Sequence, residues 1–176
     1  MTDERVLSRA VEFIVDNYRV CGEMAVTGGP RRLVDILNAL DDIVTVRDAT
    51  LDYPLAASAA PVSAAVAHIH LNTILFGIQH GVDVRFEDPF EKVNKVPIPC
   101  TIVVPGFEIS GNIYMVAEVD PSESQILTTL HFVPLTDARV VSLANPSKVW
   151  EADVFVVNLK RAVVYAPHAK TTVAVA

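Results

Sequence analysis

Short apolar runs separated by polar and turn residues cover most of the chain, and a pattern of this kind predicts strands. In the first half, the expected strands are residues 11–15, 19–26, 43–51, 65–71 and 73–80. In the second half, they are residues 100–104, 108–116, 131–143, 149–157 and 161–165. We therefore expect an all-β fold to which each half contributes five strands.

Helical periodicity is confined to short segments between or before these strands. Residues 1–10 predict a capped helical turn ahead of the first strand. Apolar side chains at a spacing of three and four after Pro30 predict a two-turn helix that ends near Leu40. A second short helix is expected after Pro121, so each half has one helix between its second and third strands.

The two halves can be aligned with each other, which predicts an internal duplication. Residues 18–22 match residues 107–111 at an offset of 89, and residues 46–49 match residues 135–138 at the same offset. Because the matching positions include turn residues, glycines and an Asp-Ala pair, the similarity extends beyond a shared apolar pattern. The alternative is a chance similarity between two β-rich segments.

Residues that favour turns and bends recur at matching places in the two halves. Asn17 lies opposite Gly106, and these residue types tolerate positive φ, so we expect a tight turn at both places. Gly22 and Gly111 stand inside the following strands, where glycine marks a bend or a close approach of two backbones. Such bends curl a sheet, and five bent strands in roughly seventy residues favour a small barrel.

The repeat divides the chain into two units. We expect a first barrel over residues 1–80, a linker over residues 81–99, a second barrel over residues 100–167 and a flexible tail over residues 168–176. Three prolines are expected to limit regular structure in the linker. They are Pro89, Pro97 and Pro99.

Two segments of the second unit carry a resemblance to a known family. Phe132-Val-Pro-Leu-Thr-Asp-Ala138, followed by Val156-Val-Asn-Leu-Lys-Arg-Ala162, is similar to uncharacterised bacterial Sm-like proteins. The order of strands and loops in both units also resembles the Sm-like fold. This resemblance implies two tandem five-stranded Sm-like (LSm-type) small β-barrels, and Sm-like units commonly join through edge strands into rings.

The sequence departs from the pattern of the Sm proteins that bind RNA. Those proteins carry Asp and Asn at a fixed short spacing after the glycine of their second strand. Here Asp35 and Asn38 lie too far beyond Gly22, inside the predicted helix, and residues 124–127 of the second unit have no equivalent acid or asparagine. The resemblance therefore implies the fold more strongly than it implies RNA binding.

Composition and charge narrow the classes of function. The 51% hydrophobic content indicates a chain that is packed along most of its length, and the net charge of −7 argues against a broad phosphate- or lipid-binding surface. The sequence has no run of 18 apolar residues and no signal-peptide pattern, so no membrane association is expected. Two cysteines cannot form a disulfide framework, which fits a cytoplasmic protein.

Few residues suggest catalysis or metal binding. His68 and His70 share one face of a predicted strand, but a zinc site needs three or four ligands, so we expect no metal and no cofactor. Cys21 has no base near it in the sequence and is interpreted as a strand residue. Asp48 and Asp137 recur at matching places and are expected to bond turn backbone rather than to act as an acid–base pair.

Four residues are candidates for binding a ligand or RNA. Asn72 falls near Asn158 at an offset of 86, in the loop between the last two strands of each unit. Lys160 and Arg161 follow Asn158 and could contact RNA in an Sm-type pore, where Asn reads a base edge and Arg stacks or pairs with phosphate. The alternative interpretation is a solvated turn that joins two strands.

A nucleotide-binding interpretation is also open. Arg5 and Arg9 have the two-arginine spacing that PilZ-like domains use against the phosphates of cyclic-di-GMP. The second motif of those domains needs a hydroxyl residue two positions after an Asp and a glycine three positions further on. Asp48 and Thr50 supply the first part, but Tyr53 stands where the glycine is required.

The sequence thus favours a non-enzymatic structural or interaction protein that forms a homo-oligomer through its barrel edges, with another protein as a possible partner. Residues 149–157, or the corresponding residues 65–71, are expected to pair with a strand of another unit, in the same chain or in a neighbour. An RNA- or nucleotide-binding Sm-like or PilZ-like module is the alternative. An enzyme with an unidentified site comes third.

Overall fold

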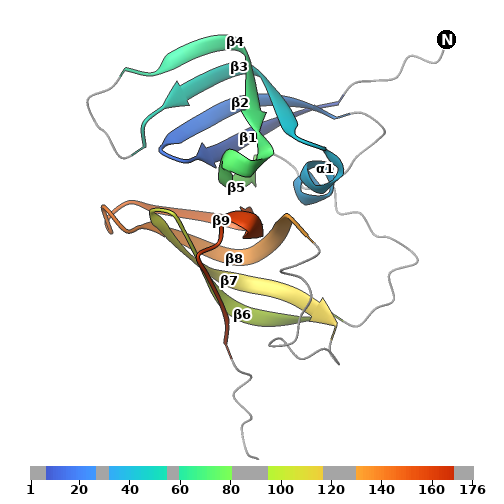
Figure 1. The fold of residues 1–176 in the computed structure, drawn as a ribbon, viewed down its shortest axis with the longest axis vertical. Coiled ribbons are helices and arrows are strands. Elements are labelled where there is room, and N and C mark those ends of the chain that lie inside the picture. The colour runs from blue at the N-terminus through green and yellow to red at the C-terminus, as the bar shows by residue number, and fades with distance from the viewer. Residues whose placement is uncertain (1–6, 27–31, 55–59, 81–94, 117–129, 169–176) are drawn as a thin grey trace, which may run out of the picture.

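The fold is built from ten antiparallel strands. The computed structural model describes residues 7–26, 32–54, 60–80, 95–116 and 130–168. The strands of the first half are β1 (Leu7–Val15), β2 (Tyr18–Val26), β3 (Ile43–Asp52), β4 (Val62–His70) and β5 (Ile74–Gln79). Those of the second half are β6 (Lys95–Val104), β7 (Phe107–Val116), β8 (Phe132–Ser142), β9 (Val149–Asn158) and β10 (Val164–Pro167). Figure 1 shows the first half, in blue to green, above the second half, in yellow to red.

The strands form one open sheet in which the two halves have the same strand order. The order is β10-β6-β7-β8-β9-β5-β1-β2-β3-β4, so the last strand of each half pairs with its own first strand. β9 pairs with β5 and joins the halves. Two separate small barrels, as the sequence predicts, are not confirmed, because β5 pairs with the other half and the sheet as a whole is not closed.

A two-residue turn joins the first two strands of each half. Gly106 adopts a φ of 81°, as expected for the residue that follows Pro105 in such a turn. In the first half the positive φ is at Asp16, with a value of 50°, and the expectation that Asn17 would adopt it is wrong by one position. Aspartate and asparagine both tolerate this conformation, so the two residues cannot be distinguished from the sequence.

Gly22 and Gly111 mark matching β-bulges. The β2–β3 register shifts between Cys21 and Glu23, and a Cβ on Gly22 would lie 2.5 Å from the Arg47 carbonyl oxygen. Each bulge is completed on the opposite strand by an aspartate with positive φ.

The corresponding bulge of the second half lies between Ser110 and Asn112. There a Cβ on Gly111 would lie 2.8 Å from the Ala138 Cβ. The aspartates of the two bulges, Asp48 and Asp137, have φ values of 48° and 49°. The close backbone approach predicted from the glycines is therefore confirmed in both halves.

The sheet encloses two hydrophobic cores that exchange side chains across the line where the halves meet. Side chains of β1 and β5 reach into the core of the second half: Ile14, Leu75, Phe76 and Ile78. In return, Phe132 of β8 and Val156 of β9 lie in the core of the first half. The cores are thus two clusters with a shared wall, and neither half buries its apolar surface alone.

The helix α1 (Leu33–Ala39) covers the first core and also contacts the second half. Leu33, Val34 and Leu37 are its buried side chains, as the helical spacing predicts. Asn38 fixes the contact, because its side chain accepts a hydrogen bond from the Phe132 amide at 2.9 Å and donates one to the Phe132 carbonyl at 2.8 Å. The helix expected after Pro121 lies outside the described residues.

The ladders establish which residues correspond between the halves. The first residue of β3, Ile43, pairs with His70, and the first residue of β8, Phe132, pairs with Asn158. His70 therefore corresponds to Asn158, 88 positions further along the chain. The match of Asn72 with Asn158 is wrong, because it assumes a longer fourth strand in the first half than the ladder has.

Four strands, β1, β4, β6 and β10, differ from their predicted extents by three residues or more, and β1 and β6 differ most. Residues 7–10 belong to β1 instead of a helical turn, and their backbone pairs with residues 23–26. β6 begins at Lys95 and includes Pro97 and Pro99, which were expected to limit regular structure. Pro97 and Pro99 are tolerated because β10 pairs only with residues 100–103, so this end of β6 has a ladder on one side.

The C-terminal end of the described chain is ordered further than expected. Pro167 belongs to β10, and the His168 amide donates a 2.8 Å hydrogen bond to the Pro99 carbonyl. The remaining residues of the predicted tail lie outside the described residues. In the ranges that the structure covers, no helix has the length and apolar character needed to span a membrane.

Candidate functional site

The line where β5 and β9 pair, called the junction here, is the most distinctive feature of the sheet. Phe76 lies opposite Val157, Gly77 opposite Val156 and Ile78 opposite Phe155. The Phe76 ring also makes edge-to-face contacts with two rings of the second half, at 5.3 Å to Phe107 and 5.8 Å to Phe155. The junction is therefore a packed interface between two five-stranded units within one chain.

A buried asparagine fastens the junction at one end. Asn158 is the last residue of β9, and its side-chain amide donates hydrogen bonds to the carbonyls of Leu71 and Ile74, at 3.1 and 2.9 Å. Its side-chain oxygen accepts a 3.0 Å hydrogen bond from the Lys160 amide. Asn158 thus holds the 3₁₀ turn η1 (Leu71–Thr73) of the first half against η2 (Leu159–Arg161) of the second.

Arg161 adds a second contact between the halves. Its guanidinium lies 2.6 Å from the Asp16 carboxylate in the β1–β2 turn and donates a 3.2 Å hydrogen bond to the Asn72 carbonyl. The side chain of Lys160 is exposed, as is that of Asn72. Asn158 and Arg161 therefore have structural contacts, and ligand or RNA binding by any of the four candidates stays a prediction.

The two strands at the ends of the sheet, β10 and β4, occupy positions that correspond to the two strands of the junction, but they do not pair with each other. β10 corresponds to β5 and β4 corresponds to β9, both at an offset of 88. Phe76 and Leu75 are fully buried at the junction, whereas the corresponding Val164 and Val163 are 46% and 72% exposed. The exposed valines at the start of β10 are therefore an uncovered apolar surface.

The β4 side shows the same contrast. Phe132 is fully buried in the core of the other half, and the corresponding Ile43 is 42% exposed. Val156 is buried at the junction, and the corresponding His68 is exposed on β4. The same sheet positions are therefore covered inside the chain and uncovered at its two ends.

β4 also has little protection against pairing. Its nine residues, Val62–His70, contain no Asp, Glu, Lys, Arg or Pro, and Val62 and Val66 are exposed. Natural edge strands usually carry charges, prolines or bulges that prevent association. An unprotected strand of this length is a surface on which another strand can pair.

His68 and His70, which share a face of β4, make separate local contacts. His68 Nδ1 lies 3.1 Å from the Thr45 hydroxyl, and His70 Nδ1 lies 3.4 Å from the Asp42 carboxylate. In the part of the chain that the structure describes, no three His, Cys, Asp or Glu side chains gather as metal ligands. His68 and His70 therefore each contact a residue on β3 or just before it.

Burial raises the pKa of both thiols. The Cys21 pKa is raised mainly by burial and then by the nearby Glu12 carboxylate. Burial raises the pKa of Cys100 to about 11. Because the thiolate is the nucleophile, both shifts oppose reactivity at neutral pH.

The remaining predicted residues have structural roles or lie outside the described part of the chain. Asp137 accepts a 3.2 Å hydrogen bond from the Asn112 side chain, and Asp48 adopts its positive φ at the other bulge. Arg9 donates a 2.6 Å hydrogen bond to Gln79 across β1 and β5. Arg5, the other arginine of the nucleotide-binding interpretation, lies outside the described residues.

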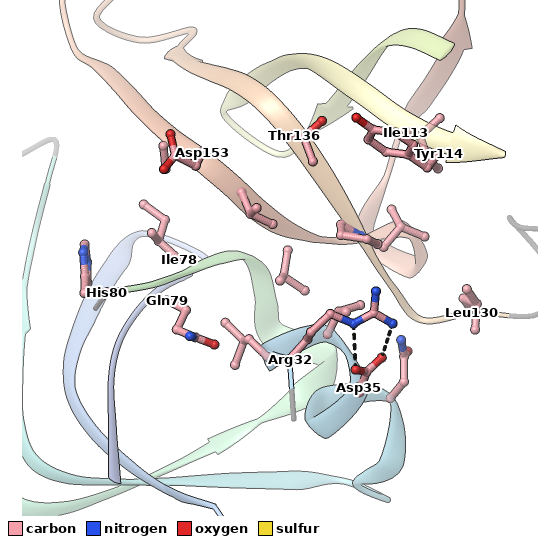
Figure 2. Close-up of a pocket in the computed structure, with 18 of the residues that line it drawn as sticks. Arg32, Asp35, Ile78, Gln79, His80, Ile113, Tyr114, Leu130, Thr136 and Asp153 are labelled. Atoms are coloured by element: carbon pink, nitrogen blue, oxygen red, sulfur yellow. Dashed lines mark hydrogen bonds and ion pairs between the residues drawn. The ribbon is translucent and has the colours of Figure 1, made fainter. Parts of the chain in front are cut away.

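A cleft of about 1100 Å³ opens beside α1, between the two halves. Figure 2 shows Arg32 and Asp35 on one wall, joined by hydrogen bonds of 2.8 and 3.0 Å, and Thr136 and Asp153 on the opposite wall. The described walls end at Arg32, Lys95 and other residues next to undescribed segments. We assign no ligand to this cleft.

The sequence predicted the two strands of the junction and the two edge strands of the sheet. It did not predict which side chains on these strands are buried and which are exposed. The exposure of Val163 and Val164 could not be predicted, because both are as apolar as the buried residues to which they correspond. The absence of charged residues in β4 is the sequence signal that indicates an unprotected edge.

The chain matches no known family model, no curated protein and no solved structure.

Proposed function

We propose that the chain is a non-enzymatic structural protein that assembles head to tail, with β10 of one copy pairing with β4 of the next. This intermolecular pairing is called the seam. The single observation that carries the proposal is the junction: one such interface is complete inside the chain, and its two separated halves are uncovered at the ends of the sheet. The assembly would repeat between copies what the chain already does between its halves.

The proposal includes an internal duplication of Sm-like units. The matched strand order, the paired bulges and the correspondence at offsets of 88 and 89 support it. Heterologous interfaces of this kind close into rings when the rotation between units permits. Since Sm-like units commonly form rings through their edge strands, we propose three chains, with six units in a pseudo-sixfold ring.

The junction supplies a register for the seam. Moving its three residue pairs by 88 positions gives pairs that join two copies. These are Val164 with Ile69, Tyr165 with His68, and Ala166 with Ala67. Val164 and Val163 would then become covered, as Phe76 and Leu75 are at the junction. The register makes the proposal specific to single residues.

A disulfide cross-link between copies tests this register. Ala67→Cys and Ala166→Cys are placed in one chain that also carries Cys21→Ser and Cys100→Ala, so that no native thiol competes. Directly opposite residues on antiparallel strands have Cα atoms about 4.5–5.5 Å apart, which lies within the range that disulfides span. We expect mild oxidation to give covalent oligomers, which electrophoresis under non-reducing conditions resolves by mass.

The matched control places the second cysteine at Val66→Cys in place of Ala67→Cys. Adjacent strand residues point to opposite faces, so this chain should cross-link far less. Equal cross-linking by both chains, or none by either, would contradict the seam.

A further inference from the structure

The Tyr165 hydroxyl is a buried polar group on β10. Its oxygen is shielded from solvent and has no hydrogen-bond partner among the described residues. The ring packs against the core of the second half. Burial raises the pKa of the Tyr165 phenol, which therefore stays protonated and can donate. A buried hydroxyl without a partner is costly, and native structures rarely keep one.

His68 presents a complementary group on the opposite end of the sheet. Its imidazole is exposed on β4, and its Nδ1 bonds with the Thr45 hydroxyl at 3.1 Å. That contact orients the ring and leaves Nε2 for another partner. A neutral imidazole accepts with one nitrogen and donates with the other, so Nε2 can bond with a hydroxyl in either tautomer.

We propose that Nε2 of His68 in one copy forms a hydrogen bond with the Tyr165 hydroxyl of the next copy. This inference rests on the proposed function, because the two residues face each other only if the seam has the register of the junction. The junction residues in their places are Val156 and Gly77, and the Val156 side chain enters the core beside Gly77. His68 would enter the second core beside Tyr165 in the same way, since directly opposite residues share a face.

The bond would give the assembly its direction. β4 could also pair with β4 of another copy, which would make a two-fold dimer instead of a head-to-tail chain. Such a dimer leaves the Tyr165 hydroxyl without a partner, so the polar pair favours β10 over a second β4. At the junction, the corresponding Val156 and Gly77 form no polar pair, and none is needed because the two halves belong to one chain.

A double-mutant cycle tests the bond. Tyr165→Phe removes the hydroxyl and keeps the ring, and His68→Leu removes the imidazole. The dissociation constant of the oligomer is measured by sedimentation velocity for both single variants, the double variant and the unaltered chain. We expect each single change to weaken the seam about five- to tenfold and the second change to add little, as a shared hydrogen bond requires.

Two further measurements separate this bond from a general effect on folding. Tyr165→Phe should raise the urea midpoint of the dilute single chain, or at least not lower it, because the change removes a buried hydroxyl that has no partner there. His68→Gln, which keeps a donor and an acceptor, should restore most of the affinity. Additive effects in the cycle, or an oligomer strengthened by Tyr165→Phe, would overturn the bond and leave the seam standing. A chain that stays monomeric and forms no Ala67–Ala166 cross-link would overturn both.

Discussion

The strands of the junction and those of the proposed seam occupy corresponding positions in two halves that have the same strand order. At the junction, β5 and β9 belong to a single chain, and large apolar side chains such as Phe76 and Phe132 are fully buried in the neighbouring half. At the seam, the corresponding side chains are Val164 and Ile43, which are smaller and partly exposed. The same sheet positions therefore carry large buried side chains at the junction and smaller, partly exposed ones at the two edges of the sheet.

The two pairings differ in that the strands of the junction belong to one chain, whereas those of the proposed seam would belong to two. Two units on one chain meet at a high effective concentration, so their contact persists without polar specificity. Units on different chains must find each other and pay the entropy of association. The histidines on β4, which stand in place of Val156 and Asn158, and the smaller apolar groups would make the proposed seam weaker than the junction and able to open.

The largest expected effect is the loss of a junction side chain. Phe76→Ala removes a fully buried ring that contacts Phe107 and Phe155, so we expect the free energy of unfolding to fall by about 3–5 kcal/mol. Val164→Ala is the matched change at the seam and should cost the dilute chain less than about 1 kcal/mol. Urea denaturation of both variants at low concentration measures the contrast.

The two positions should rank in the opposite order in their effect on assembly, when variants that remain folded are compared. Val164→Ala is expected to weaken oligomers while Phe76→Leu, a milder change that preserves folding, leaves the seam intact. Equal losses of stability from Phe76→Ala and Val164→Ala would break the comparison, since the two positions would then be equally packed within one chain.

The equivalence of the halves is sharpened at the bulges. Gly22→Ala places a Cβ 2.5 Å from the Arg47 carbonyl oxygen, and Gly111→Ala places one 2.8 Å from the Ala138 Cβ. Contacts this short force the backbone apart, so both changes should destabilise the chain by about 1–3 kcal/mol. The Gly22 variant should lose more, because a backbone carbonyl yields less than a methyl group. Thermal unfolding of the two variants gives the order, and tolerance of either change would contradict a close approach there.

An effect of similar size is expected at the polar end of the junction. Asn158→Ala removes the donors to the Leu71 and Ile74 carbonyls, and a buried acceptor left without a partner costs about 1–3 kcal/mol. The corresponding His70→Ala should change the unfolding free energy of the dilute chain by at most about 0.5 kcal/mol. Chemical denaturation of the pair measures both, and a larger loss from His70→Ala would reverse their assigned roles.

The smallest effect is a change in thiol reactivity on assembly. Cys100 lies opposite Pro167, beneath the short strand β10, and burial raises its pKa to about 11. At pH 8 a thiol with this pKa is only about one part in a thousand thiolate, so labelling is slow and quickens as pH rises toward 11.

Covering β10 at the seam should slow Cys100 labelling further as the protein concentration increases. Cys21, on β2 and away from the seam, is the internal control and should label at a rate independent of concentration. Mass spectrometry of the intact and digested chain resolves the two rates. A Cys100 rate that does not respond to concentration would separate β10 from the association.

Local patterns in the sequence predicted the strands because alternation and glycine placement are local properties. Gly22 and Gly111 indicated a bend or a close backbone approach, which the structure shows as bulges. Residues 149–157 were expected to pair with another unit, as β9 does with β5. The helical spacing after Pro30 likewise predicted α1. These features depend on neighbours in sequence or on a repeat that sequence alone reveals.

Features that depend on tertiary context were missed. Pro97 and Pro99 suggested a break, but one side of β6 lacks a ladder there, so the missing amides cost nothing. Asn158 was named as a candidate for ligand or RNA binding, which stays a prediction, but its burial in the junction could not be predicted because the residue type alone does not show burial. Its hydrogen bonds to residues more than eighty positions away place it in the junction.

The mass of the unaltered chain in solution tests the central claim most directly. Sedimentation equilibrium across the micromolar range, at moderate salt, reports the number of chains without any label or substitution. We expect a reversible equilibrium between the single chain of 19.1 kDa and a discrete closed species, with three chains as the predicted number. A single chain at every concentration would contradict the account, because the uncovered strands β4 and β10 would then have no counterpart in each other.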